Sequence, residues 1–287
     1  MSLSRTLFRG TPRPAPPRTL QHRDARMSTS RAHPPFPFTP ASTPTPAPPQ
    51  PPAPQFLPTC YEHILARPSL STSRPATLTK LKAGLAIQAE HPDFLGCVLE
   101  GVGVEDEGLA LRILEWTSLE GHMHSFRGGP LYPRFLAARQ GAYADAGTMT
   151  HVRFLPRGPG GLSQAAVLEH MHLALLSPSS FAEFCARLLP LLDKYVAPSP
   201  GSAGFSLGQQ IEDPSQVIIL FGWQRVEDHT VGFRQGEAFG DWSSAVGPVL
   251  ERFVKGGLGG MEIRHFRTCA AGEGVRADEG EEGIGEE

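Results

Sequence analysis

An internal repeat is the sequence feature that most constrains the fold of this chain. Shifted by 107 positions, residues 62–135 align on residues 169–242 without a gap. The most similar stretch reads W-x3-E-x-H-x3-F-R-x4-[YF]-x2-[FW], and it begins at Trp116 in the first copy and at Trp223 in the second. Since the matched residues keep their spacing inside one motif, we interpret the alignment as a duplication. A duplication predicts two copies of one supersecondary unit.

Both copies show the same order of expected elements. Strands are expected where apolar or β-branched runs are bounded by Ser, Pro or Glu-Asp turns, and helices where apolar residues recur at helical spacing. The expected strands are 61–66, 94–104, 109–116 and 149–155, then 166–175, 205–211, 217–223 and 261–266, and the expected helices are 75–90, 119–142, 179–196 and 226–255. The order β-α-β-β-α-β, found twice, predicts two tandem ferredoxin-like units.

A single ferredoxin-like unit leaves one face of its sheet open. Residues expected on that face stay apolar, as do Leu111 and Ile113 in the first copy and Ile218 and Leu220 in the second. A sheet that is apolar on both faces needs a second cover. We therefore expect an α+β fold in which the two units pack sheet to sheet into a barrel within one chain, which makes the protein a monomeric pseudo-dimer.

Composition divides the chain into segments. Residues 1–58 hold 16 of the 29 prolines and carry a net charge of +6, residues 59–270 carry −3, and residues 271–287 carry −6. Only the central part has the composition of a folded domain. We predict a disordered Pro- and Arg-rich leader over 1–58, ferredoxin-like repeats over 59–158 and 163–268, and a disordered acidic tail over 270–287.

Charge and hydropathy exclude two classes of partner. The central segment has no excess of basic residues, and no apolar run reaches the roughly 20 residues of a membrane span, so neither nucleic acid nor a membrane is an expected partner. The four cysteines form no C-x-x-C pair, which is typical of free thiols in a reducing, cytoplasmic compartment. Residues 1–34 are Arg-rich and acid-poor and allow a mitochondrial transit peptide, unless Met27 is the true start.

Histidines are the main chemical resource of the repeats. Three pairs lie on matching elements: His63 and His170, His122 and His229, and His151 and His265. Because the first and last strands of a ferredoxin-like sheet are neighbours, we expect His63 to lie near His151 and His170 near His265. Two imidazoles that face one cavity can act as general base and as hydrogen-bond donor. The alternative is that these are core histidines whose rings bond to backbone carbonyls.

Several aromatic and basic side chains are candidates for the cavity wall. Trp116 and Trp223 each close a strand, where they either plug the junction of sheet and helix or line the cavity. We place His122 and His229 on the same wall. Arg127 and Arg234 follow them by about one helical turn, and they either pair with surface carboxylates or anchor an acidic group of a ligand.

A metal site is not expected from the histidine spacing. His170 and His172 form an H-x-H pair that could chelate a metal or haem iron, and His172 could also line the pocket. No third ligand accompanies the pair at a firm spacing, and Leu65 replaces His172 in the first copy.

The repeated motif also carries a family resemblance. Gly101-x3-Glu105-Asp106 and the run from Leu114 to His122, together with their counterparts in the second copy, resemble the dimeric α/β-barrel superfamily. Within it the chain is similar to the antibiotic-biosynthesis-monooxygenase (ABM)-like domains found as tandem copies in fungi. The resemblance covers about residues 60–268. It implies a cavity between sheet and helices for aromatic or polyketide-like molecules, which some members oxidise with O2 and no cofactor.

The resemblance and the histidines together predict a function. We expect a cofactor-independent monooxygenase, an oxidoreductase, that acts on a small hydrophobic or aromatic molecule. His63 and His170 are the leading catalytic candidates, assisted by His151 and His265. The alternative is a non-catalytic ligand-binding or stress-associated barrel. A haem-binding protein is a third possibility, since relatives with this fold bind haem, decarboxylate or isomerise, and fold alone does not select a reaction.

Overall fold

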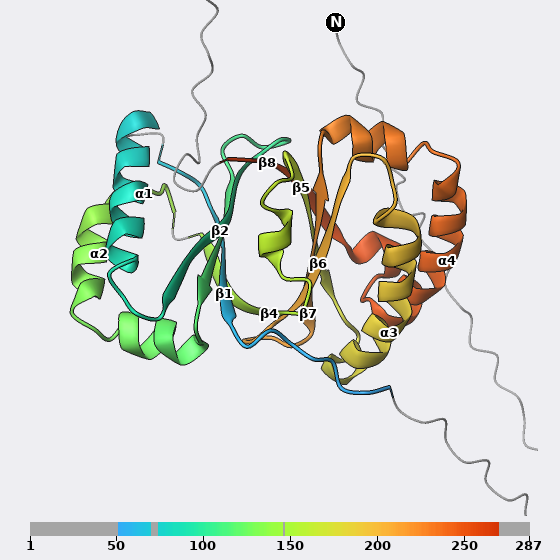
Figure 1. Ribbon diagram of the computed structural model, residues 1–287, viewed down its shortest axis with the longest axis horizontal. Coiled ribbons are helices and arrows are strands. Elements are labelled where there is room, and N and C mark those ends of the chain that lie inside the picture. Colours follow the sequence, from blue (N-terminus) through green and yellow to red (C-terminus); the bar gives the residue numbers. More distant parts are fainter. Residues whose placement is uncertain (1–50, 70–73, 146, 270–287) are drawn as a thin grey trace, which may run out of the picture. The chain divides into compact units, whose positions relative to one another are not determined.

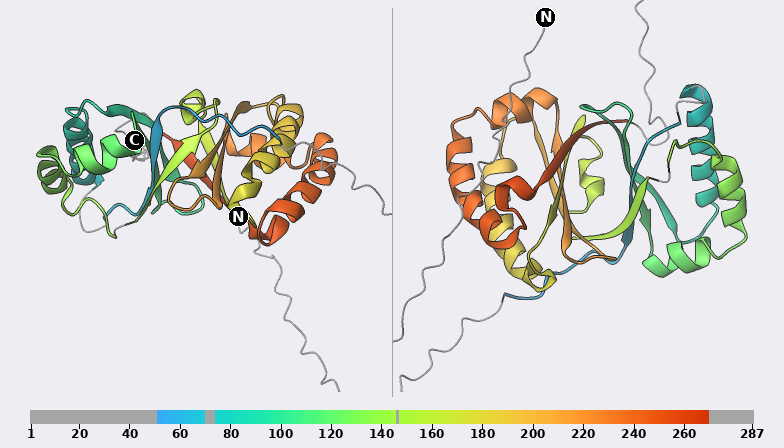
Figure 2. Two further views of the ribbon diagram at one scale, coloured as in Figure 1. Left: turned by 90° about the horizontal axis from the view of Figure 1, so that it is seen from below. Right: turned by 180° about the vertical axis from the view of Figure 1, so that it is seen from behind.

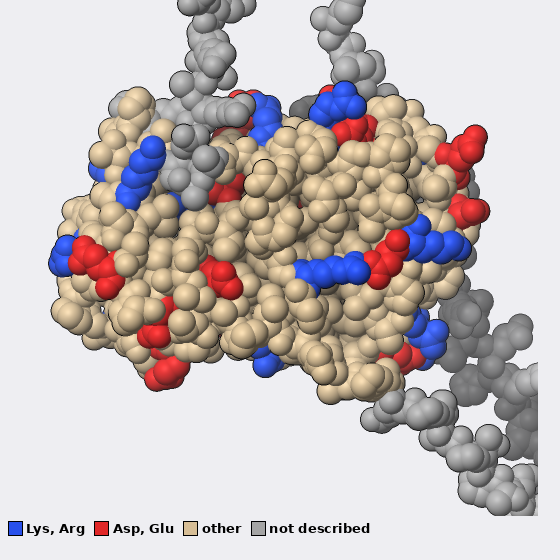
Figure 3. Space-filling model, in the orientation of Figure 1, with Lys and Arg blue, Asp and Glu red and all other residues tan. Residues whose placement is uncertain are grey.

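The computed structural model describes residues 51–69, 74–145 and 147–269. Most of the predicted leader and the whole of the predicted acidic tail lie outside the described residues, as does the segment considered as a transit peptide. Within the described residues no helix has both the length and the apolarity needed to cross a membrane. Acidic and basic side chains are interspersed over the face in Figure 3, and neither sign gathers into a large patch there.

Eight antiparallel strands form one closed barrel. Around the barrel the order is β1-β3-β2-β8-β5-β7-β6-β4. The strands are β1 (Cys60–Ala66), β2 (Phe94–Gly103), β3 (Ala110–Trp116), β4 (Thr148–Phe154), β5 (Val167–Ala174), β6 (Ser202–Gln210), β7 (Gln216–Trp223) and β8 (Glu262–Thr268). Each half supplies the ferredoxin-like order of four strands, β4-β1-β3-β2 from the first and β8-β5-β7-β6 from the second. This arrangement confirms the predicted fold, two tandem ferredoxin-like units that share an intramolecular dimeric α/β barrel.

Helices cover the outer face of each half-barrel. α1 (Arg74–Gln88) and α2 (Leu131–Arg139) lie on the flank of the first half, and α3 (Phe181–Leu191) and α4 (Ala238–Phe253) lie on the flank of the second (Figures 1 and 2). The shorter helical segments are η1 (Gly121–Phe126), η2 (Pro159–Leu162), η3 (Pro178–Ser180), η4 (Leu192–Val196), η5 (Asp228–Phe233) and η6 (Gly257–Gly260). Every strand therefore has one face toward the helices and one toward the barrel interior.

The barrel interior is packed with side chains from both halves. Leu111 and Ile113 from β3 meet Ile218 and Leu220 from β7 in one buried cluster, and all four side chains are excluded from solvent. These are the residues expected on the open faces of the two sheets. Leu162, from the η2 segment that connects the halves, packs into the same cluster. The apolar inner faces thus explain why the two units close on each other.

The second helix of each unit differs from the prediction. The sequence predicts one helix over 119–142, but the structure divides it into the π-helical turn η1 and the α-helix α2. Gly128, Gly129 and Pro130 separate the two parts, and the glycine is shared by both copies, since a Cβ at Gly129 or at its counterpart Gly236 would lie 2.5 Å from a backbone oxygen of the preceding turn. The expected helix over 226–255 is divided in the same way, into η5 and α4.

Two matched glycines lie at the seams between the halves. Gly101 of β2 pairs with Thr268 of β8, and Gly208 of β6 pairs with Phe154 of β4. A Cβ on Gly208 would lie 2.5 Å from Cγ1 of Val152 and 2.7 Å from Cδ1 of Phe154. The strands can approach this closely only because the side chain is absent.

Gly208→Ala is therefore expected to lower the free energy of unfolding by about 1–3 kcal/mol, since the added methyl overpacks the seam. Urea denaturation measures the loss. Gly160→Ala is the control, because a Cβ at Gly160 meets nothing within 4 Å and its cost should stay close to zero. Equal stabilities of the two variants would contradict the prediction.

Candidate functional site

Each half contains a cavity between the outer face of its sheet and the covering helices. The first cavity has a volume of about 350 Å³ and the second about 130 Å³. The first is lined by Glu62, Ile64, Ala66, His122, Arg127, Tyr132, Phe135, Leu136, Arg139, Gln140, Tyr143, Asp145 and Met149. The second is lined mainly by apolar side chains, with Glu169, Trp223, His229 and Arg234 at its polar end. The first cavity thus lies in the size range of ordinary small-molecule sites.

A row of acid and histidine side chains begins at the first cavity, which Glu62 and His122 line. The first histidine row consists of Glu62, His122, His151 and Glu212. His122 Nδ1 lies 2.7 Å from His151 Nε2, and His151 Nδ1 lies 2.5 Å from Oε1 of Glu212. At the inner end, Glu62 Oε2 lies 3.6 Å from His122 Nε2 and accepts a 3.1 Å hydrogen bond from Trp116 Nε1. The row connects the cavity to Glu212, whose side chain is 47% exposed.

The second half repeats this arrangement. The second histidine row consists of Glu169, His229, His265 and Glu105. His229 Nδ1 lies 2.8 Å from His265 Nε2, and His265 Nδ1 lies 2.5 Å from Oε1 of Glu105. Glu169 Oε2 lies 3.4 Å from His229 Nε2 and accepts a 3.3 Å hydrogen bond from Trp223 Nε1. The two rows have nearly the same distances, so the repeated motif forms the same local geometry in both halves.

Each row is completed by the opposite half of the molecule. Glu212 follows β6 of the second half and accepts hydrogen bonds from both the ring and the backbone N–H of His151 in the first half. Glu105 follows β2 of the first half and bonds to His265 of the second in the same way. The Glu-Asp turns of the repeat therefore hold the two halves together and orient the outer histidines.

The bonding pattern fixes the direction of the hydrogen bonds in the first row. An ionised carboxylate only accepts, so His151 donates from Nδ1 to Glu212. A neutral imidazole has one donor, so His151 Nε2 accepts the N–H of His122 Nδ1. The Nε2 of His122 is then an acceptor, and its 3.6 Å separation from Glu62 is longer than a hydrogen bond. This nitrogen can accept a proton from a molecule in the first cavity.

Burial decides the protonation of the inner groups. It raises the pKa of the Glu62 carboxyl above its ordinary value and raises the pKa of Glu169 to about 7. Burial also lowers the pKa of His122 to about 3 and that of His229 to about 4. Partial burial favours a higher pKa for Glu212, but the hydrogen bonds from His151 outweigh it and lower the pKa. Each inner ring is therefore neutral, which suits a group that passes a proton on.

The inner histidines are presented by an unusual local structure. His122 lies on η1 and His229 on η5, and both segments are π-helical turns, which occur often at functional sites. His122 stacks on Trp116 with ring centroids 4.5 Å apart, and His229 stacks on Trp223 at 5.3 Å. The tryptophan at the end of the third strand thus sets the orientation of the histidine that follows it.

The expected pairing of first-strand and last-strand histidines is wrong. In the register of β1 and β4, His151 lies opposite Glu62, and His63 lies opposite Thr150. Because side chains alternate between the faces of a strand, His63 faces the barrel interior while His151 faces the helices. His265 is separated from His170 in the same way, since it pairs with Glu169.

His63 and His170 instead meet each other inside the barrel. They belong to opposite strands of the closed barrel, and their Nε2 atoms lie 2.9 Å apart. Both rings are buried, and neither lines the first or the second cavity. The structure therefore places the two leading catalytic candidates away from both cavities, in a contact between the two halves inside the barrel.

Some of the other residues predicted to line the cavity do so, and others lie elsewhere in the fold. His122 lines the first cavity, and His229 and Trp223 line the second. Trp116 is buried against Phe126 and Phe135, where it packs as a plug. His172 pairs with Glu262 on the barrel-interior face of β5 and lies outside both cavities. Of the two interpretations given for Arg127 and Arg234, the inward one fits, since each lines a cavity.

The carboxylates of the rows are the functional residues that the sequence analysis missed. Glu62 and Glu169 precede the matched histidines of the first strand, and Glu105 and Glu212 open the matched Glu-Asp turns. All four are identical in the two copies, so the repeat carried a signal for them. The repeat could not show that the turn of one half contacts the last strand of the other half, because that contact depends on how the two halves pair.

The two cavities differ at matched positions. Tyr132, Arg139 and Tyr143 line the first cavity, and the residues 107 positions later are Phe239, Val246 and Leu250, which line the second. Arg139 lies over the rings of Phe135 and Tyr143, with its guanidinium carbon 4.6 and 4.7 Å from the ring centroids. The first cavity therefore has a second guanidinium and two phenol groups that can hydrogen-bond a ligand, whereas its counterpart is smaller and more apolar.

Comparisons with known proteins agree on the fold. No family model and no curated protein matches the sequence. An anthrone oxidase-like protein of known structure is 15% identical, with a TM-score of 0.52 over 77% of this chain and 96% of its own. A provisionally named monooxygenase from Lactobacillus acidophilus is 9% identical, with a TM-score of 0.50 over 73% and 94%. Another from Fusobacterium nucleatum is 7% identical, with a TM-score of 0.51 over 73% and 92%.

These likenesses show the fold alone, and the fold they show is the dimeric α/β barrel. The solved neighbours are barrels of the ABM-like monooxygenase type, which the sequence motif resembles. The expected resemblance is confirmed at this level. The fungal subtype stays a prediction.

Proposed function

We propose that the protein is a cofactor-independent monooxygenase of the ABM-like type that oxidises a small aromatic or polyketide-type molecule in the first cavity. The observation that carries this function is the combination, in a single cavity, of a proton acceptor connected to solvent and two guanidinium groups. His122 supplies the acceptor, and Arg127 and Arg139 supply the charge. A cavity of about 350 Å³ has room for a compact aromatic ligand.

The charged groups suit a substrate that becomes an anion. Arg127 and Arg139 line the cavity together with the hydroxyl-bearing rings of Tyr132 and Tyr143. Among the described residues, neither arginine has a carboxylate partner within ion-pair distance. Guanidinium groups stabilise phenolate and carboxylate oxygens by charge-assisted hydrogen bonds. A substrate that carries a phenol or acid beside an apolar ring system matches this lining.

The proposed reaction begins with proton removal. An anthrone-type phenol has an activated methylene, and His122 Nε2 takes one proton from it, leaving an electron-rich anion. Because burial opposes a charged ring at His122, the proton moves on through His151 toward Glu212. The row therefore removes the proton from the low-dielectric cavity while the arginines hold the anion.

Oxygen then reacts with the anion directly. The anion transfers one electron to O2, and the two radicals combine to form a C–O bond. The row returns the proton to the peroxide oxygen, and loss of water from the hydroperoxide leaves a carbonyl. The sum is CH2 + O2 → C=O + H2O, which balances without a flavin, haem or external reductant.

Oxygen uptake with a panel of anthrone-type phenols tests the function. The wild-type protein should consume O2 in proportion to quinone formed. His122→Gln should lower kcat by about 100-fold or more, the usual contribution of a positioned acid–base group. Circular dichroism establishes that the variant is folded. Binding of the panel without oxygen uptake would instead support the non-catalytic ligand-binding barrel.

The duplicated arginine supplies a matched control. Arg127→Met removes a charge from the first cavity and should raise KM for phenolate substrates. Arg234→Met makes the same change in the second cavity and should leave the rate at the wild-type level. A loss of activity in Arg234→Met with none in Arg127→Met would move the reaction to the other half and overturn the assignment of the first cavity.

A further inference from the structure

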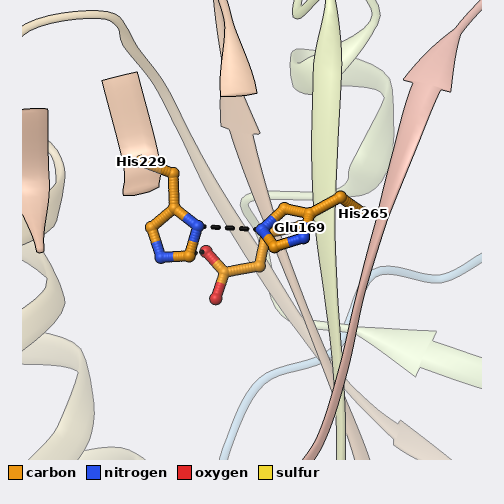
Figure 4. Close-up of side chains that lie close together, drawn as sticks. All are labelled: Glu169, His229 and His265. Atoms are coloured by element: carbon orange, nitrogen blue, oxygen red, sulfur yellow. Dashed lines mark hydrogen bonds and ion pairs between the residues drawn. The ribbon is translucent and has the colours of Figure 1, made fainter. Parts of the chain in front are cut away.

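We propose that Glu169, His229 and His265 form a binding site for a divalent transition-metal cation of the Zn²⁺ and Fe²⁺ class. The three residues come from β5, η5 and β8 of the second half, and Figure 4 shows their side chains converging on one another. The site lies in the half opposite to the proposed oxygenase cavity. Its occupancy can therefore be measured independently of catalysis.

The geometry of the three side chains suits a common ligand. Each offers one ligand atom, and these atoms all lie within 4.8 Å of one another. All three residues are buried, with relative exposures of 5%, 4% and 8%. Among the described residues, no other group of three His, Cys, Asp or Glu side chains converges in this way. A cation at this point would be enclosed rather than held on a surface.

The donor set indicates the class of cation. Imidazole nitrogen suits Zn²⁺ and Fe²⁺, whereas Ca²⁺ and Mg²⁺ prefer oxygen ligands alone. Two histidines and one carboxylate leave coordination positions open for water or a small ligand. Glu169 and His229 both line the second cavity, so that cavity provides the space for such a group.

The three proposed ligands are oriented by hydrogen bonds and a ring stack from neighbouring residues, as ligands in metal sites commonly are. His265 bonds through Nδ1 to Glu105 at 2.5 Å, the carboxylate–histidine arrangement that orients a metal-binding imidazole and leaves its Nε2 toward the cation. Trp223 donates its indole N–H to Glu169 Oε2 at 3.3 Å and stacks on His229. All three ligands are thus oriented before any cation arrives.

Electrostatics favours the second histidine row over the first. Arg139 and Arg112 both act on Glu62 in the first half, and each guanidinium opposes a cation there. The residues at the matched positions of the second half are Val246 and Ile219, which carry no charge. One guanidinium, that of Arg234, acts on Glu169 and His229, whereas three guanidinium groups act on Glu62 and His122, so the second row opposes a cation less than the first does.

Cation binding must rearrange a hydrogen bond in this site. In the metal-free protein one proton lies between His229 Nδ1 and His265 Nε2, which are 2.8 Å apart. A cation on His265 Nε2 takes the lone pair that accepts this hydrogen bond, so the bond between the two rings must break when the cation binds.

Titration of the full-length, chelator-treated protein with Zn²⁺ tests the site. Isothermal calorimetry should give about one tight equivalent per chain. Co²⁺ serves as a second probe, because nitrogen ligation changes its visible spectrum. Absence of a saturable Zn²⁺ site would overturn the proposal.

Matched variants separate this site from adventitious binding. His229→Gln should weaken Zn²⁺ binding by more than about 100-fold, and Glu105→Gln, behind the ligand His265, by about 10- to 100-fold. His122→Gln makes the same change in the first row and should leave Zn²⁺ affinity at the wild-type value. If His229→Gln does not fold, Glu169→Gln and its counterpart Glu62→Gln provide the same comparison. Equal affinities within either matched pair would overturn the site.

Discussion

Arg112→Ile is expected to lower the free energy of unfolding by about 3–5 kcal/mol. Arg112 is 3% exposed, and its Nε lies 3.0 Å from Oε1 of Glu100, which is buried to the same extent. Removing one member of a buried ion pair leaves the other charge without compensation, which costs far more than the pair itself contributes. Urea denaturation at neutral pH measures the loss. A cost below about 1 kcal/mol would contradict this account.

The second half shows how the same positions fold without charge. Leu207 and Ile219 stand where the first half has Glu100 and Arg112, and both are buried in the apolar core beneath the helices. The double variant Glu100→Leu/Arg112→Ile copies this solution. It should recover most of the stability lost in Arg112→Ile, because replacing a buried pair by apolar residues of similar volume is often neutral or stabilising. A double variant as unstable as the single one would show that this pair stabilises the protein in its own right.

The ion pair of Arg112 and Glu100 is one of several polar features of the first half. Arg112 Nη1 lies 3.5 Å from the hydroxyl of Tyr143, and Tyr143 lines the first cavity. The bridge that Tyr143 makes to Pro68 is made in the second half by Val254 to Leu175, so an apolar residue stands at this place. One half thus has a buried ion pair beside its cavity, whereas the other has apolar side chains at the matched positions. This divergence is the physical basis for giving the two halves different functions.

The fold could be predicted because the repeat constrains it strongly. Once two βαββαβ units are inferred, the apolar residues left on each open sheet face require the units to pack together. Leu111 and Ile113 were expected on such a face and lie in the barrel interior. Local pattern also predicted the tryptophan that ends each third strand. These inferences need only strand alternation and burial, which the sequence displays directly.

The site could be predicted only in part, because it depends on register. Strand order correctly made β1 and β4 neighbours, but a shift of one residue reverses every side chain, and the observed pairs are Glu62 with His151 and His63 with Thr150. The contact of Glu212 with His151 crosses between the halves, and no local pattern encodes it. Histidines were thus identified as the chemical resource, while their partners were not.

Replacing both histidines of the barrel interior by leucine is expected to keep the protein folded, whereas replacing one should cost about 1–3 kcal/mol. His63→Leu leaves the Nε2 of His170 without its partner at 2.9 Å, and the Nδ1 of His170 already has none among the described residues. A buried polar atom without a partner carries its full desolvation cost, but removing both members avoids it. A double-mutant cycle measures the coupling, and additive losses would contradict the pairing.

The same substitution should change the pH dependence of stability. Burial, with a smaller contribution from the nearby His172, lowers the pKa of His63 from 6.5 to about 3, and burial with His63, His172 and Arg264 nearby lowers the pKa of His170 as well. Below pH 6.5 the unfolded chain binds a proton at this residue that the native protein does not, so the free energy of unfolding falls as the pH falls. The loss is about 1.4 kcal/mol per pH unit, or about 2 kcal/mol between pH 6.5 and 5. Between pH 6.5 and 5, the double leucine variant should therefore lose at least about 2 kcal/mol less stability than the wild-type protein does. If both proteins instead show the same pH profile, His63 is protonated in the folded barrel.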